Sequence, residues 1–282
     1  MENLREKLKD NHTLLDWDFL TDTVLDKKVL KEVQKFHNNT MNVNSAIINN
    51  MEVSPNLFRW IETVAFQDIL PNSYEEIVQL NIKKRWVTQS AKEFKQDSVI
   101  SLDDIGQLLY EAFGRSTESG SKNYPSAGAL YPIVPLLLVL KDKAIEGIKV
   151  PGSFVFNSTD FNLIRTSSWK TEEQIEKTLN LINLDGDCIA PYCIAYAIDY
   201  KRAVSKYSHK GYRHALIEIG LMAQRFREVL INNTGLSERC WSGFIDMPLS
   251  HACGLNVRLC PIALIQWFGV PEKNTGDSYE NN

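Results

Sequence analysis

Lys206 and Tyr207, adjacent in the sequence, are the two side chains best suited by type to move a proton. Desolvation or a neighbouring cation brings a lysine amine towards neutrality, and a phenol can donate or relay a proton. The pair follows an apolar segment and precedes a long helical pattern, so we expect it on a loop over residues 205–213, held between rigid elements. Basic residues gather around the pair: Lys201, Arg202, Lys206, Lys210 and Arg213. A solvent-facing basic turn is therefore the alternative interpretation.

A second stretch, residues 124–132 with the sequence YPSAGALYP, combines small residues with prolines. Small residues let a backbone approach a flat ligand closely, and prolines fix the turn that presents it. The apolar run over residues 135–140 predicts a strand that is covered on both faces. The pattern predicts a rigid backbone ledge, residues 125–129, at the edge of a buried sheet. An ordinary loop before a core strand is the alternative.

The composition is that of a globular protein without a strong charge bias. The chain has 282 residues, of which 44% are hydrophobic and 23% charged, and its net charge is −4. This balance gives no basic surplus for nucleic acid. No apolar run is long enough to cross a bilayer, and the charged N-terminus lacks a signal-peptide core, so we expect a cytoplasmic protein. The five cysteines include no CxxC pair, which predicts buried free thiols and no metal site.

Hydrophobic spacing and capping residues outline the elements that must position these residues. Ser101, with Asp104 three residues on, predicts the start of a helix over 101–113. The other expected elements are a hairpin over 152–164, a polar helix over 171–180, a strand over 188–198, a helix over 212–230 and a strand over 262–269. Helices and strands alternate without strict βαβ order, so the predicted class is α+β. His12 and His37 are expected to be solvated, and His251 to lie in a polar loop.

The chain is predicted to have three parts. Residues 1–80 read as a mainly helical N-terminal extension, for which contact with a partner or a peptide substrate is a hypothesis. Residues 81–275 form the main domain, and residues 276–282 are a polar tail expected to be disordered.

Several of these motifs together resemble one family. YPSAGALYP, the pair Lys206-Tyr207 followed by Gly211-Tyr212-Arg213, the helix GYRHALIEIGLMAQ and the turn WSGF are similar to motifs of the SagB-type dehydrogenases, the McbC-like branch of the nitroreductase fold. The resemblance covers roughly residues 82–273. It implies a nitroreductase-like fold, with a central, mostly antiparallel sheet flanked by helices. It also implies bound FMN and a homodimer in which both chains hold each flavin.

The resemblance also assigns residues. Lys206 and Tyr207 match the family's catalytic pair. The positions that match cofactor-binding residues are Ser90, Lys92, Pro125, Ser126, Ala127, Gly128, Ala129, Gln224, Ser242, Gly243 and Lys273. Two positions depart from the family pattern. The first arginine of the phosphate clamp is missing unless Arg85 replaces it, and Arg225 stands where the family usually has asparagine.

The activity implied by the resemblance is oxidation of azoline rings. Such a dehydrogenase uses FMN to convert thiazolines or oxazolines of a ribosomally made precursor peptide to thiazoles or oxazoles, in company with cyclodehydratase subunits. Two alternatives stay open at the level of sequence. One is a nitroreductase or flavin reductase fed by NAD(P)H, and the other is a non-catalytic scaffold subunit of a peptide-modifying complex.

Overall fold

The computed structural model describes residues 25–43, 54–64, 68–69, 72–73, 75–82, 90–169, 190–233 and 235–272. The predicted helix over 171–180, the tail over 276–282, His12, Arg85, Cys188 and Lys273 lie outside these residues.

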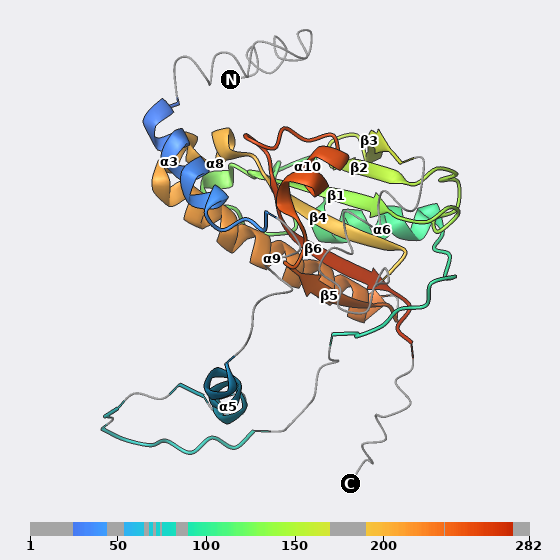
Figure 1. The fold of residues 1–282 in the computed structure, drawn as a ribbon. Helices are drawn as coiled ribbons and strands as arrows, with labels where there is room; N and C mark the ends of the chain where they lie inside the picture. Colours follow the sequence, from blue (N-terminus) through green and yellow to red (C-terminus); the bar gives the residue numbers. More distant parts are fainter. Residues whose placement is uncertain are drawn as a thin grey trace.

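A six-stranded sheet forms the centre of the molecule (Figure 1). Its strands are β1 (Ile133–Val139), β2 (Gly152–Asn157), β3 (Asn162–Ser168), β4 (Tyr192–Ile198), β5 (Ser237–Trp241) and β6 (Ile262–Gly269). They lie in the order β3-β2-β1-β4-β6-β5, and each neighbouring pair is antiparallel. The expected hairpin and the strand over 262–269 are therefore confirmed, as is the α+β class. The strand predicted over 188–198 is observed from Tyr192, and residues 188 and 189 lie outside the described residues.

The described helices are α3 (Lys27–Asn38), α5 (Pro55–Val64), α6 (Leu102–Phe113), α8 (Tyr200–Tyr207), α9 (His209–Asn233) and α10 (Asp246–Ala252), with a 3₁₀ turn η2 (Ala127–Ala129). The N-cap of α6 is the one that the sequence predicted, because the Ser101 hydroxyl accepts a hydrogen bond of 3.0 Å from the Asp104 amide. The long helix extends beyond the predicted range of 212–230 at both ends.

The two faces of the sheet carry two separate cores. Side chains of a strand alternate between faces, so Leu137 and Val139 of β1 pack with α6 and α9 while Leu136 and Leu138 pack with α10. In Figure 1 α9 runs along one face of the sheet and α10 lies over the other. Burial on both faces explains why β1 and β4 read as continuous apolar runs.

The loop predicted over residues 205–213 is not observed. Helix α8 runs through Lys206 and Tyr207, capped at its start by Asp199, which accepts a hydrogen bond of 3.0 Å from the Arg202 amide. Only Ser208, with φ of 54°, separates α8 from α9. A Cβ on Gly211 would lie 1.9 Å from the Ala203 carbonyl oxygen, so glycine permits this tight turn between the two helices. The reactive pair therefore lies on the last turn of a helix.

Three further expectations were wrong. His37 is buried, with 3% of its surface exposed, because α3 packs against α8 and α9 and its Nδ1 lies 2.8 Å from the Tyr212 hydroxyl. Burial lowers the pKa of His37 to about 4. His251 lies in helix α10 and not in a loop. Cys240 is exposed, whereas the cysteines were expected to be buried.

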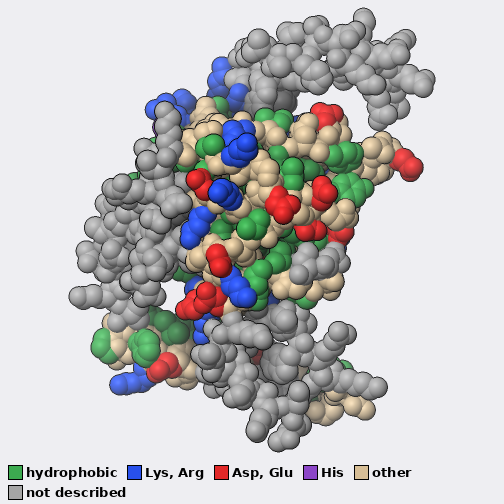
Figure 2. All heavy atoms as spheres, turned by 90° about the vertical axis from the view of Figure 1, so that its right-hand side faces the viewer, with side chains coloured by type: hydrophobic (Ala, Val, Ile, Leu, Met, Phe, Trp, Pro, Cys, Tyr) green, Lys and Arg blue, Asp and Glu red, His purple; other side chains and the backbone are tan. Residues whose placement is uncertain are grey.

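The surface is of mixed charge on the face shown in Figure 2, where acidic and basic side chains both occur with hydrophobic ones between them. Within the described ranges, no helix is long and apolar enough to span a membrane.

Candidate active site

The ledge is a tight turn that leads into β1. Gly128 has φ of 64°, a backbone conformation that favours glycine, and Ala129 has φ of 55°. Ser126 holds the turn in place: its carbonyl oxygen accepts from the Ala129 amide at 3.1 Å, and its hydroxyl accepts from the Tyr131 amide at 2.9 Å. A non-glycine residue at positive φ costs free energy and is found most often at functional sites. The ledge residues are exposed or half-buried, so a flat ligand has access to them.

Lys206 and Tyr207 lie directly against this ledge. A Cβ added to Gly128 would lie 2.6 Å from the Tyr207 hydroxyl oxygen and 3.0 Å from the Lys206 Nζ. The ammonium lies 5.3 Å from the centroid of the Tyr207 ring. Lys206 is exposed and Tyr207 is half-buried, so both can meet a substrate. The fold thus joins the two motifs that the sequence singled out, although about 80 positions separate them.

A small cavity with a mostly apolar lining lies behind the pair. It has a volume of about 10 Å³, and the side chains that matter for its chemistry are Tyr207, His214 and Glu218. The His214 ring meets the Tyr207 ring edge to face, with centroids 5.0 Å apart. Glu218 is 2% exposed, and burial raises the pKa of its carboxyl to about 7, although contacts with Ser126 and with basic groups oppose that rise.

Sequence reasoning did not assign His214 or Glu218 a functional role. The available signal was the position of Glu218 on α9, since it falls on the same helical face as Ala215, Ile219 and Met222, which are all buried. Burying a carboxylate within an apolar stripe costs free energy unless an opposite charge or hydrogen bonds compensate it.

Basic groups surround this carboxyl. Lys122 lies with its Nζ 5.7 Å from the Tyr124 ring centroid and 5.6 Å from that of Tyr131. Burial, together with the charges of Arg115 and Arg202, lowers the pKa of Lys122 to about 8, and Glu218 acts in the opposite direction. The region beneath the ledge therefore carries groups that change protonation near neutral pH.

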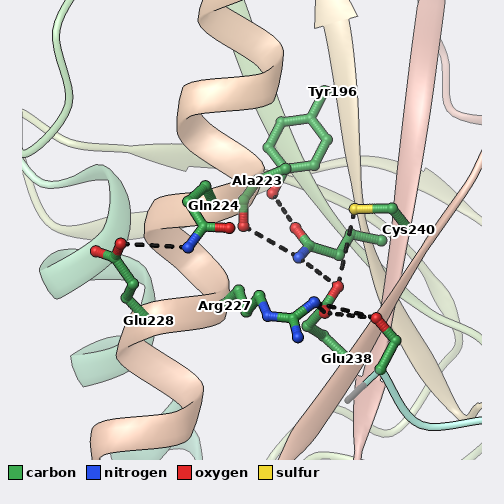
Figure 3. A network of polar contacts seen from close by, with 9 residues as sticks. Tyr196, Ala223, Gln224, Arg227, Glu228, Glu238 and Cys240 are labelled. Atoms are coloured by element: carbon green, nitrogen blue, oxygen red, sulfur yellow. Dashed lines mark hydrogen bonds and ion pairs between the residues drawn. The ribbon is translucent and has the colours of Figure 1, made fainter. Parts of the chain in front are cut away.

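The predicted phosphate residue Ser90 belongs to a different polar network, drawn in Figure 3. Arg227 donates to Glu238 Oε1 at 2.8 Å and to the Ser90 hydroxyl at 3.1 Å, and Ser90 donates to the same carboxylate oxygen at 3.2 Å. Gln266 donates to the other carboxylate oxygen at 2.8 Å. Arg227 is a basic residue beside Ser90 that sequence reasoning missed. Lys92 is exposed, and its carbonyl accepts from Arg239 at 3.3 Å.

The turn that contains Ser242 and Gly243 follows β5 directly. The Trp241 indole donates to the Gly243 carbonyl at 2.8 Å, which fixes the turn. Asn42, just after α3, donates to the Ser242 and Phe244 carbonyls at 3.2 and 3.1 Å. The segment that follows α3 is therefore tied to this turn.

Two residues near the end of the family-like helix lie apart from the ledge contacts. Gln224 is exposed and donates to Glu228 at 3.3 Å (Figure 3). Arg225 donates to the Glu111 carbonyl at the end of α6, at 3.3 and 3.2 Å. Its departure from the family's asparagine thus has a structural role, because it satisfies a terminal helix carbonyl.

Helix α9 separates two groups of predicted cofactor residues. The ledge, matched to the flavin ring, contacts one face of this helix, and Ser90, matched to the phosphate, contacts the opposite face. Glu218 faces the ledge and Arg227 faces Ser90, and nine positions along a helix of 3.6 residues per turn correspond to a rotation of about 180°. Within the described residues, no group of three His, Cys, Asp or Glu side chains is placed to bind a metal ion.

Comparisons with known structures identify the class of protein. A chain of the Escherichia coli microcin synthetase McbBCD complex, solved with truncated pro-MccB17 bound, superposes with a TM-score of 0.79 at 24% identity, over 94% of this chain and 99% of that one. A Ralstonia eutropha protein provisionally named a nitroreductase superposes with a TM-score of 0.53 at 16% identity, over 66% of this chain and 80% of its own. The chain therefore has the nitroreductase-like fold.

Comparison of the sequence with those of known proteins finds two similar proteins. The microcin B17-processing protein McbC of E. coli is 28% identical over 184 residues, which are 64% of this chain and 66% of McbC. A Methanocaldococcus jannaschii protein provisionally named a nitroreductase is 25% identical over 207 residues, 73% of this chain and 91% of its own. No family model matches the chain. The chain is thus similar in sequence to McbC and has the nitroreductase-like fold, and the alignment spans 66% of the length of McbC.

Proposed function

We propose that this protein is an FMN-dependent dehydrogenase that oxidises azoline rings of a ribosomally made peptide to thiazoles or oxazoles. The observation that carries the proposal is the contact of Gly128 with both Lys206 and Tyr207. It places an amine and a phenol at the edge of a ledge made of small residues, where a flat ring system can lie beside them.

The residues present suit a flavin. The ledge over 125–129, which is exposed or half-buried, offers backbone and methyl groups to one face of a ring, and a side chain at Gly128 would collide with Tyr207 and Lys206. Ser242 and Gly243 supply backbone groups for the ring edge. Ser90, Lys92 and Arg227 supply a hydroxyl and two cations for the phosphate, and Arg227 takes the place of the missing clamp arginine. When bound, a flavin supplies a hydride acceptor.

The arrangement on α9 supports a homodimer with a shared cofactor. In one chain the ring residues and the phosphate residues contact opposite faces of this helix. A flavin held between two copies can take its ring contacts from one and its phosphate contacts from the other.

The residues of this chain manage the proton lost from the azoline ring. Tyr207 relays it through its hydroxyl group, and the nearby Lys206 side chain stabilises negative charge that develops on the phenol oxygen. The ledge fixes both groups relative to the ring, and orientation of this kind supplies much of the rate in a two-partner reaction.

The peptide substrate and the partner subunits are supported by the relatives. The similar E. coli chain comes from a microcin synthetase complex with a truncated pro-peptide bound, and McbC is named for microcin B17 processing. We therefore propose an azoline-containing precursor peptide as substrate and cyclodehydratase subunits as partners.

The test uses purified protein and an azoline peptide. We expect a flavin absorption spectrum and, by mass spectrometry, the loss of two hydrogens per ring. Lys206→Ala and Tyr207→Phe should keep the flavin and lose turnover, while Lys210→Ala, an exposed neighbour, serves as the matched control. Full turnover in both pair variants would contradict the mechanism.

Two results would favour the alternatives. Rapid bleaching of the flavin by NADPH would indicate a nitroreductase or flavin reductase, the class suggested by the names of the M. jannaschii and R. eutropha proteins. Failure to bind added FMN would indicate a scaffold subunit.

A further inference from the structure

The cavity behind Tyr207 is lined by two residues that each have a buried polar atom with no hydrogen-bond partner among the described residues, His214 Nδ1 and Glu218 Oε1. Buried polar atoms are nearly always satisfied, so two beside one cavity call for a functional reason. The volume of about 10 Å³ is close to that needed for a single water molecule, and Tyr207, His214 and Glu218 all line the cavity.

Helix geometry sets these two side chains side by side. His214 and Glu218 are four positions apart on α9, so they lie on the same face one turn from each other. Tyr207 approaches from the end of α8, with its ring edge to face against His214. The three groups therefore form a short chain that leads from the ledge into the protein.

The charges around Glu218 keep its ionised form within reach. Lys122 and Arg202 favour the carboxylate, as does a hydrogen bond from Ser126. Burial opposes it, and the phenol of Tyr124 lies in the same cluster. Because these effects balance near neutrality, the carboxyl can both gain and lose a proton at the pH of the cell.

We propose that Glu218 is the proton acceptor behind Tyr207, reached through one water molecule that His214 orients. This inference rests on the proposed function. A ring C–H bond breaks and an O–H bond forms on Tyr207, while the Tyr207 hydroxyl proton moves through the water to a Glu218 carboxylate oxygen, so that the phenol is restored. A bound flavin would accept the hydride that leaves the neighbouring ring carbon. Glu218 acts through Tyr207 and does not touch the substrate.

A free-energy argument supports a functional role. Keeping an ionisable carboxyl at 2% exposure destabilises the fold when the carboxyl is charged, and a glutamine of the same shape, which does not ionise, would remove that cost. Active sites are where such destabilising groups are usually retained.

The first experiment needs no cofactor. Protein labelled with 3-fluorotyrosine is titrated by ¹⁹F NMR, and the Tyr207 resonance is assigned as the signal that Tyr207→Phe removes. We expect this resonance to shift with a midpoint near pH 7, as the neighbouring Glu218 carboxyl titrates. Glu218→Gln should abolish this shift, whereas Glu228→Gln, an exposed glutamate on the same helix, should retain it.

His214→Gln removes the imidazole beside the ring and so tests whether the resonance shift comes from Glu218. A midpoint that survives His214→Gln and is lost in Glu218→Gln supports the proposal. A midpoint that survives Glu218→Gln, or is lost only in His214→Gln, overturns it.

The second experiment is the pH profile of turnover on an azoline peptide. Turnover should rise as the Glu218 carboxyl ionises, and Glu218→Gln should remove this rise and lower turnover by about 100-fold, the lower end for general-base groups. If Tyr207→Phe is inactive while Glu218→Gln keeps the parent rate and profile, this inference alone fails. If Tyr207→Phe is itself active, the proposed role of Tyr207 fails, and if the parent protein does not oxidise the azoline peptide, the proposed function fails.

Discussion

The substitution Glu218→Gln should make the protein more stable at alkaline pH and have a smaller effect at acidic pH. The pKa of this carboxyl rises from 4.5 to about 7 on folding, chiefly through burial. A raised folded-state pKa means that the fold favours the protonated carboxyl. Its contribution to stability is therefore fully present below pH 4.5 and is lost as the pH rises through about 7.

The magnitude follows from the same shift. The difference between 7 and 4.5 is 2.5, and at 1.36 kcal/mol for each pKa unit the pH-dependent loss is about 3 kcal/mol. Glutamine has nearly the same shape and does not ionise. The free energy of unfolding of Glu218→Gln, minus that of the parent, should thus increase by about 3 kcal/mol between pH 4 and pH 8.

Urea denaturation of both proteins across this pH range measures the difference. Other groups with raised pKa values, such as Asp199 and Asp246, titrate in both proteins and cancel in the subtraction. Glu228→Gln, which changes an exposed carboxyl, should show no comparable trend. If the difference in the free energy of unfolding stays constant from pH 4 to pH 8, the carboxyl at position 218 does not have a pKa raised by burial, and the reasoning is refuted.

Three further substitutions test the site. Gly128→Ala should abolish turnover, because the new Cβ would lie 2.6 Å from the Tyr207 hydroxyl. Gly120→Ala is the control, because Gly120 also has a positive φ, of 72°, but has open space around it, and this variant should retain turnover. Equal losses of turnover in both variants would point to backbone strain alone. Arg225→Ala should lower the free energy of unfolding, measured in urea, by about 1–2 kcal/mol, because the Glu111 carbonyl loses both hydrogen bonds from Arg225. The flavin absorbance should not change, and a colourless variant would assign Arg225 to the cofactor. Asn42→Ala removes the side-chain donor to the Ser242 and Phe244 carbonyls and should lower the free energy of unfolding by about 2 kcal/mol in the same assay. Flavin binding, measured by fluorescence titration, should become weaker. Unchanged values would mean that these two hydrogen bonds contribute neither to stability nor to flavin binding.

The parts of the fold that local rules govern were predictable. The N-cap of α6 depends on Ser101 and Asp104, three positions apart, and β6 was placed at residues 262–269 from its apolar run alone. Helix α8 was missed because its sequence is short and basic, with its apolar residues confined to one face. Its helical state is stabilised by the Asp199 cap and by packing of Ala203 and Val204 beneath it.

Contacts between distant segments decided the remainder. His37 reads as a polar loop neighbour, and only the packing of α3 against Tyr212 buries it. Arg227 joins Ser90 because α9 and β5 meet there, and no sequence spacing relates positions 90, 227 and 238.

The sequence by itself determined which residues could do chemistry: an adjacent amine and phenol, and a glycine-containing ledge of small residues. Only the tertiary structure decided that these two motifs touch, and that a buried carboxyl at position 218 stands behind them. The physical reason is that residue type and capping act over a few neighbouring positions. A cavity, a desolvated charge and a shifted pKa depend on how whole helices and strands pack against one another.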